Sequence, residues 1–208
     1  GVPGPFYVNT EKLIGAEAAE RLLSTINAIV TTADTTQQKA EQVERIVMEE
    51  YNANTTFQKI IATMVRDSRA QFGDAYNTIS GGERRDWFFS IPFALESGLD
   101  HIYLFKNGSI YTKPDNVSKL QGTPKVLHVA DLINNAASYF DKWIPILKSN
   151  NVSMIGTACV INRGNVGIDK LKDAGIATCS LKTIDKAFFD DLSAIKLIEE
   201  SVAQEINL

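Results

Sequence analysis

Residues 126–140 read VLHVADLINNAASYF and place a strand pattern, an acid and a helix pattern in one short stretch. The apolar run 126–130 has the length and composition of a buried β-strand, and it ends at Asp131. Small and polar residues follow at 134–138, where the helix pattern begins. Ligands bind beyond the carboxyl ends of the strands in an open α/β sheet, so this unit predicts both a fold class and the position of a site.

Strand and helix patterns alternate on both sides of this unit. Asn107 and Gly108 join two of the strands with the sequence typical of a tight hairpin, and Pro145 is expected to bend one helix. The alternation predicts an α/β fold with a largely parallel sheet flanked by helices. Strands are predicted at 76–80, 101–106, 109–113, 126–130, 152–161 and 176–181, and helices at 87–97, 136–149, 165–174 and 190–206.

Residues 14–72 differ, because their apolar side chains recur at helical spacing throughout. Three helices are predicted here, with breaks at 31–36 and 52–55, where Thr, Asp and Asn can cap the next helix. We therefore expect a single domain over residues 1–208, made of a helical subdomain at 14–73 and an α/β core at 74–208. The helical subdomain is interpreted as an N-terminal insertion that forms a hood or a dimer surface.

Composition narrows the classes of function. The 208 residues are 44% hydrophobic and carry a net charge of −4, which argues against a sequence-independent nucleic-acid binder. No apolar run is long enough to span a membrane, and no signal-peptide pattern is present, so a cytoplasmic protein is expected. Cys159 and Cys179 are expected to be free thiols. His101 and His128 are isolated in strand patterns and are expected to serve in packing.

The loop after Asp131 has the properties of a phosphate site. A helix N-terminus offers unpaired N–H groups and a partial positive charge, and small residues would let a phosphate approach the backbone. Asp131 could accept hydrogen bonds from ribose hydroxyls. The alternative is an ordinary strand–turn–helix unit with Asn and Ser caps. The candidate loop residues are Asn134, Asn135, Ala136, Ala137 and Ser138.

A second candidate anion site lies in SGGERRDW, residues 80–87, between a predicted strand and a predicted helix. Gly81 and Gly82 could let the backbone form a concave nest for an anion. Arg84 and Arg85 could neutralise a diphosphate. The alternative is a tight turn followed by two solvated arginines.

Taken in order along the chain, these segments resemble type I phosphoribosyltransferases of the orotate kind. Ala130 and Asp131 stand where that family has an acid pair, and Asn162 and Arg163 stand where the orotate enzymes have Asp-Arg. The run LKDAGIATCSLKTID at 171–185 resembles the family's last strand and final helix. GPFYVNTE at 4–11 is similar to the orotate-binding segment near the start of the family's chains.

The resemblance implies an activity. The chain would transfer a phosphoribosyl group from phosphoribosyl pyrophosphate to orotate or a similar base in pyrimidine nucleotide biosynthesis, with Mg²⁺ bridging diphosphate and ribose oxygens. A homodimer is implied in the same way. The implied catalytic residues are Asp131 and Lys106; the implied substrate-binding residues are the loop at 134–138, Gly81, Gly82, Arg84 and Arg85 for the phosphates, and Arg163, Phe6 and Tyr7 for the base.

Several departures from the family pattern bear on activity. Ala130 replaces the first acid and removes one ribose contact, and Ala136 and Ala137 replace loop glycines, which restricts positive φ. Phe105 precedes Lys106 where the family has an Arg-Lys pair.

A tight hairpin also replaces the family's mobile catalytic loop, and Lys113 or Lys119 could substitute for its lysine. Two other functions therefore stay open: a non-catalytic relative that binds a phosphoribosyl ligand as a regulator, and a different α/β nucleotide-binding protein. The presence of Asp131, Lys106 and Arg163 favours a divergent enzyme.

Overall fold

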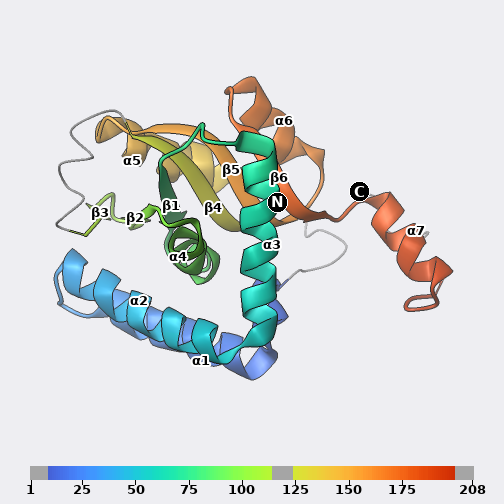
Figure 1. Cartoon of the computed structure of the whole chain (residues 1–208), viewed down its shortest axis with the longest axis horizontal. Coiled ribbons are helices and arrows are strands. Elements are labelled where there is room, and N and C mark those ends of the chain that lie inside the picture. Colours follow the sequence, from blue (N-terminus) through green and yellow to red (C-terminus); the bar gives the residue numbers. More distant parts are fainter. Residues whose placement is uncertain (1–8, 114–123, 200–208) are drawn as a thin grey trace.

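The computed structural model describes residues 9–113 and 124–199, which form a six-stranded sheet with helices on both faces (Figure 1). The strand order is β3-β2-β1-β4-β5-β6, and all neighbouring strands are parallel except β2 and β3. The predicted α/β fold with a largely parallel sheet is confirmed. The strands are β1 (Thr78–Gly82), β2 (Asp100–Leu104), β3 (Ile110–Tyr111), β4 (Lys125–Ile133), β5 (Ser153–Asn162) and β6 (Ala177–Thr183).

Helices bury both faces of this sheet. Along β4, Leu127 and Val129 face the core shared with α1–α4, whereas Val126 and Ala130 face the two smaller clusters on the other side. Successive strand residues point to opposite faces, so a strand buried on both sides reads as the continuous apolar run seen in the sequence. The helices are η1 (Thr10–Ile14), α1 (Ala16–Thr31), α2 (Thr36–Ala53), α3 (Thr55–Phe72), α4 (Asp86–Ser97), η3 (Tyr139–Trp143), α5 (Ile144–Ser149), α6 (Asn165–Asp173) and α7 (Lys186–Ala194).

The three helices predicted in the N-terminal third are present as α1, α2 and α3. Their starts follow the predicted caps: Thr35 and Gln38 form a capping box at α2, and the Asn54 side chain accepts from the Phe57 N–H at α3. In Figure 1, α1 and α2 lie side by side below α4, and α3 runs from them up to the sheet. None of the described helices is long and apolar enough to cross a membrane.

Aromatic side chains join these helices to the α/β core. The ring of Phe57 on α3 meets Phe89 on α4 edge to face at 6.0 Å and Tyr51 on α2 at 5.4 Å. Two tyrosine hydroxyls extend the junction, since Tyr51 donates to Glu96 and Tyr103 donates to Glu44, both at 2.6 Å. The helical part and the sheet therefore share one hydrophobic core. Their division into a subdomain at 14–73 and a core at 74–208 stays a prediction.

Two helix predictions were wrong in their bounds. The helix predicted at 136–149 begins one residue later, at Ala137, because Ala136 has a φ of 56° and cannot join a right-handed helix, and it includes the five-residue π-helix η3. The helix predicted at 190–206 begins at Lys186, because the Asp185 side chain caps it by accepting from Phe188 N–H, and it ends at Ala194. The end of that prediction lies outside the described residues.

The strand bounds also shifted. β4 continues past Asp131 to Ile133, because β5 pairs with it as far as Asn162. β1 lies two residues later than predicted, at Thr78–Gly82, in register with β2 from Asp100. Cys159 is buried, Cys179 is partly buried, and both are free thiols.

We expect Phe57→Ala to lower the free energy of unfolding by about 3–5 kcal/mol, because it removes a fully buried ring at the junction of α2, α3 and α4. Urea denaturation followed by circular dichroism measures the change. Leu95→Ala is the control, since Leu95 lies on α4 with 60% of its surface exposed and should change stability by less than about 0.5 kcal/mol. Equal effects of the two changes would show that the Phe57 junction does not hold the parts together.

Candidate active site

The chain changes direction across the sheet between β1 and β4. After β1 it adds β2 and β3 on one side, and it then returns to add β4, β5 and β6 on the other. α4 follows β1 on one face of the sheet and α5 follows β4 on the opposite face, so a crevice opens between the two strand ends. A cavity of about 540 Å³ lies there.

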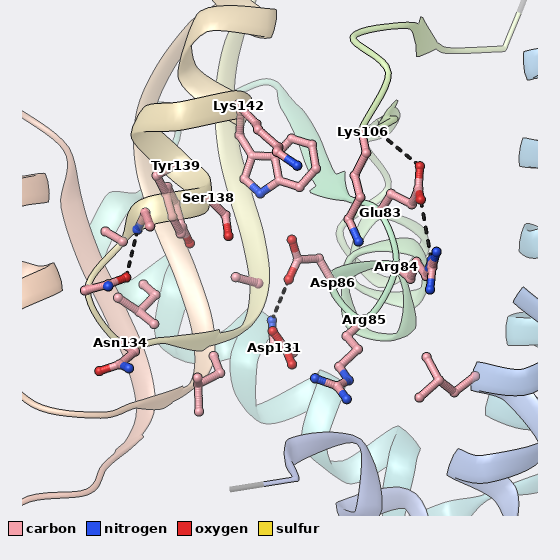
Figure 2. A pocket seen from close by; sticks show the side chains of 18 of the residues that line it. Glu83, Arg84, Arg85, Asp86, Lys106, Asp131, Asn134, Ser138, Tyr139 and Lys142 are labelled. Atoms are coloured by element: carbon pink, nitrogen blue, oxygen red, sulfur yellow. Dashed lines mark hydrogen bonds and ion pairs between the residues drawn. The ribbon is translucent and has the colours of Figure 1, made fainter. Parts of the chain in front are cut away.

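Four segments surround this cavity (Figure 2). One wall is the turn at 83–86 after β1, and Lys106 after β2 projects beside it. The opposite wall is the loop at 134–138 together with the first turn of η3, and the end of β4 forms the floor. Leu23 and Asn27 of α1 close one side. The structure thus brings both candidate anion-binding segments to one site.

Two carboxylates meet on the floor of the cavity. Asp86 begins α4 and Asp131 lies in β4, and the backbone N–H of Asp131 donates to Oδ1 of Asp86 at 3.1 Å (Figure 2). The N–H of Gly82 donates to Oδ2 of Asp86 at 3.2 Å, and the Thr10 hydroxyl donates to Oδ2 of Asp131 at 2.9 Å. Burial, followed by the charge of Asp86, raises the pKa of Asp131 to about 7.

Basic side chains face this acid pair. Figure 2 shows the Lys106 side chain reaching into the cavity towards Asp86, with Arg85 beside Asp131. Burial, followed by the charge of Arg84, lowers the pKa of Lys106. Lys142 adds another cation from η3. The cavity therefore offers three cations on one wall, one on the opposite wall and acids between them.

Acids and an amide hold the cationic wall in place. Arg84 donates to Oδ1 of Asn27 on α1 at 2.5 Å and lies 3.5 Å from Glu83, and Glu83 also accepts from the backbone N–H of Lys106 at 3.0 Å. Nε of Arg85 lies 3.3 Å from the buried carboxylate of Glu11 in η1. The N-terminal helices thus contact the site directly and do more than cover the core.

The loop opposite is small and tightly supported. The Asn135 side chain accepts from the N–H of Ala137 at 3.1 Å, and Ala136 adopts the positive φ for which glycine is usual. From below, the backbone N–H of Arg163 donates to the Ile133 carbonyl at 2.8 Å. α6 packs so closely against the loop that a Cβ on Gly167 would collide with the Asn134 carbonyl oxygen. The Ser138 hydroxyl faces the cavity (Figure 2).

No protein-family model and no curated protein matches the sequence. Solved structures match its fold. Orotate phosphoribosyltransferase from Aeropyrum pernix aligns with a TM-score of 0.56 and 15% identity, over 72% of this chain and 81% of that one. The orotate enzyme from Francisella tularensis gives a TM-score of 0.57 and 13% identity, over 76% and 80% of the two chains. The chain has the type I phosphoribosyltransferase fold.

An adenine phosphoribosyltransferase from Thermoanaerobacter pseudethanolicus shares this fold too, with a TM-score of 0.51 and 15% identity over 67% of this chain and 86% of that one. The resemblance stated from the sequence is therefore confirmed at the level of the fold. Because the fold is common to orotate and adenine enzymes, it does not decide between the two bases.

Most of the predicted site residues lie in this cavity of the phosphoribosyltransferase fold, although their roles stay predictions. Gly81 and Gly82 end β1, where an added Cβ would meet Ser90 or Trp143, so close packing requires these glycines whether or not an anion binds. Phe6, Tyr7 and Lys119 lie outside the described residues. The residues brought together are Lys106, Asp131, Arg84, Arg85, Asn134, Asn135, Ala136, Ala137 and Ser138.

Two other predicted residues lie away from the cavity. Arg163 follows β5 directly and is not among the residues that line the cavity. Lys113, a predicted substitute for the catalytic-loop lysine, places its ammonium 2.7 Å from Glu44 on α2.

Sequence reasoning assigned no role to several residues of the site. Asp86 is the second-last residue of the quoted run SGGERRDW, but nothing local shows that it would meet Asp131, 45 residues later. Asn27 and Lys142 come from predicted helices, and Glu11 ends the segment 4–11 that was compared with the orotate-binding segment, but none of the three was given a role in the site. An acid directly after an Arg pair at a helix start was the one available signal, and it is equally typical of a first-turn acid facing the helix dipole.

We expect Asp131→Asn to raise the free energy of unfolding at pH 8 by about 1–3 kcal/mol. The pKa of Asp131 in the folded protein, about 7, exceeds its ordinary value of 3.8, so folding favours the protonated acid. The stability due to this proton is complete below about pH 4 and is lost as pH rises through 7.

Urea denaturation at pH 4, 6 and 8 measures this effect, and the gain of the variant should vanish at pH 4. Asp173→Asn is the matched control, because Asp173 is exposed on α6 and away from the acid pair. If Asp131→Asn were less stable than the wild type at pH 8, the ionised carboxylate would be favourable in the fold and the expectation would be wrong.

We also expect Gly167→Ala to lower the free energy of unfolding by about 1–3 kcal/mol. Its Cβ would overlap the Asn134 carbonyl and lie 2.9 Å from Cγ2 of Ile133, so α6 or the loop must move. Thermal denaturation measures the loss. Val166→Ala changes the neighbouring, 62% exposed residue of the same helix and should be nearly neutral. Equal melting temperatures for the two variants would refute the close approach of α6 to the loop.

Proposed function

We propose that the chain binds phosphoribosyl pyrophosphate in this cavity and transfers its phosphoribosyl group to the nitrogen of orotate or a similar base. One observation carries the proposal: a phosphate-sized loop, an acid pair and a cationic wall face one another across a single crevice of the phosphoribosyltransferase fold. The charges of the site complement a ligand that has two anionic ends and hydroxyl groups between them.

The 5′-phosphate is assigned to the loop at 134–138. Ala136 and Ala137 line the cavity with small side chains, and Ser138 turns a hydroxyl towards it. Hydrogen bonds from backbone N–H groups and a hydroxyl suit a phosphate oxygen. The left-handed φ of Ala136 shows that this loop keeps the turn which glycine would allow.

The diphosphate is assigned to the wall formed by Arg84, Arg85 and Lys106. Each guanidinium already has an acceptor nearby, Glu83 and Asn27 for Arg84 and Glu11 for Arg85, so both groups are held in place before the ligand arrives. Groups held in place before reaction stabilise developing charge without paying for reorganisation. Mg²⁺, when bound together with the ligand, would supply positive charge that offsets the charge of the diphosphate.

The reaction assigned to the site is a displacement at C1′ of the ribose. The lone pair of the base nitrogen forms the new bond to C1′, the bond from C1′ to the diphosphate oxygen breaks, and its electron pair leaves with the diphosphate. A proton carried by that nitrogen is lost to solvent. Lys106 and the two arginines would stabilise the leaving charge, and Asp131 would position the ribose.

Orotate is proposed as the base from the resemblance and from the two orotate enzymes that share the fold. Arg163, which the resemblance assigns to the base, lies outside the cavity lining, and the adenine enzymes share the fold as well. A homodimer and a cytoplasmic location are proposed on the sequence and the resemblance alone. The alternative is a non-catalytic regulator that binds the phosphoribosyl ligand, which the alanine at position 130 favours.

Calorimetry with phosphoribosyl pyrophosphate tests the proposal. We expect magnesium-dependent binding, and a loss of about 10–100-fold in affinity for Arg84→Ala or Lys106→Ala, as for removal of one charge-assisted contact. Arg45→Ala is the matched control, because Arg45 is exposed on α2 and pairs only locally with Glu49. Absence of binding at millimolar ligand would overturn the proposed function.

Pyrophosphate release separates the enzyme from the regulator. The ligand-bound protein is mixed with orotate, adenine or uracil, and released pyrophosphate is measured over time. Release with orotate alone supports the proposed reaction, and release with adenine alone corrects the base. Tight binding with no release for any of the three bases would favour the regulator.

A further inference from the structure

The carboxylate of Asp86 occupies an unexpected place, beside Asp131 at the centre of the cavity. The two acids come from different elements, the start of α4 and the strand β4. Asp86 lines the cavity, yet only 13% of its side-chain surface is exposed. The sequence predicted that Ala130 removes one ribose contact, and the structure brings in another acid next to Asp131.

Backbone hydrogen bonds fix the position of Asp86. One of its oxygens accepts from Gly82 N–H at the end of β1 and the other from Asp131 N–H in β4. Oδ2 also faces the His128 ring, but Oδ1 has a second lone pair that can still accept a bond from a ligand. Asp86 is thus tied to both strands that flank the crevice and remains able to bind.

An independent feature, the buried ring of His128, points at the same carboxylate. His128 in β4 is fully buried, and its Nδ1 lies 2.9 Å from the Ser80 hydroxyl. Its Nε2 has no hydrogen-bond partner within the described structure and lies 3.6 Å from Oδ2 of Asp86. With Ser80 as donor to Nδ1, the other ring proton lies on Nε2 and is directed at the Asp86 carboxylate.

These contacts distinguish the two acids. Asp86 accepts from two backbone N–H groups and has an imidazole behind it, whereas burial beside this charge raises the pKa of Asp131 to about 7. Asp131 can therefore hold a proton near neutral pH and donate it, and the oxygens of Asp86 beside it can accept. A donor and several acceptors side by side match two neighbouring hydroxyl groups.

We propose that Asp86 is a ligand-binding residue that forms, with Asp131, a site for the vicinal hydroxyls of a ribose, in the role that Ala130 cannot fill. The inference rests on the proposed function and names the residue that recognises the sugar. Charge supports the assignment, because the acids lie between the loop at 134–138 and the cationic wall (Figure 2). Phosphates would be repelled from the acids and drawn to either side, which leaves the uncharged diol between them.

Ribose 5-phosphate, 2-deoxyribose 5-phosphate and inorganic diphosphate are the probes for a calorimetric test. We expect the wild type to bind ribose 5-phosphate about tenfold more tightly than its 2-deoxy analogue, the effect of one hydrogen bond to a charged group. Asp86→Ala should abolish this preference and leave the affinity for diphosphate equal or higher, because a negative charge is removed. A wild-type preference below twofold would overturn the proposal without any variant.

Two further comparisons guard against a purely structural effect. Asp86→Asn keeps the size of the side chain and one acceptor for the backbone, and it should also lose the preference for the 2-hydroxyl. Asp141→Asn on η3 is the matched control with an unchanged preference. If both Asp86 variants kept the preference, or lost ribose 5-phosphate and diphosphate in equal measure, Asp86 would have no specific part in sugar binding.

The test of Asp86 and the test of the proposed reaction can fail independently of each other. Failure of pyrophosphate release with a retained preference for ribose would reject the transferase and keep Asp86 as a diol-binding residue. Release of pyrophosphate in Asp86→Ala at the wild-type rate and KM would reject the role of Asp86 and keep the transferase.

Discussion

The carboxylate of Asp86 bridges the two strand ends on which the site depends. Gly82 N–H and Asp131 N–H both donate to it, so the first residue of α4 joins the end of β1 to β4. Beyond this point the two strands lead to helices on opposite faces, and nothing in the sheet pairing would hold their ends at a fixed separation. A charged acceptor shared by both backbones supplies that constraint.

The carboxylate of Asp86 also destabilises the ionised form of its neighbour. A second acid, Asp131, lies against it, and burial, followed by the repulsion between the two acids, raises the pKa of Asp131. Proteins keep such pairs where ligand binding uses them, and they accept lower stability in return. In the cationic wall of Arg84, Arg85 and Lys106, by contrast, the charges of the arginines are offset by acids nearby. Glu83 lies close to Arg84, and Glu11 lies close to Arg85. The ligand would meet charges whose positions are already set.

The N-terminal segment completes the site from outside the α/β core. Thr10 reaches Asp131, Glu11 reaches Arg85, and Asn27 of α1 reaches Arg84. The helical part also packs onto α4 through the rings of Phe57 and Phe89. Movement of α1 relative to α4 would shift the cationic wall. The hydrophobic junction therefore helps to fix the positions of the arginines in the site.

The sequence by itself determined the elements and the fold class. Residues 126–130 are apolar except for His128, as suits a parallel strand buried on both sides, and the spacing of apolar side chains in 14–72 specified three helices. These properties are local, so periodicity and caps such as Thr35 and Asn54 reveal them. The candidate loop at 134–138 and the pair Arg84-Arg85 were found for the same reason: each follows a strand in an alternating pattern.

Only the tertiary structure decided which acids meet. Asp86 and Asp131 are 45 residues apart, and their contact depends on the register of β1 with β4 and on the face to which α4 departs. The contacts of Glu11 and Asn27 with the two arginines depend in turn on how α1 packs on the core. Sequence periodicity records which side of an element is apolar, but it holds no information on which two elements will bring their polar ends together, because that choice is made by packing across the whole fold.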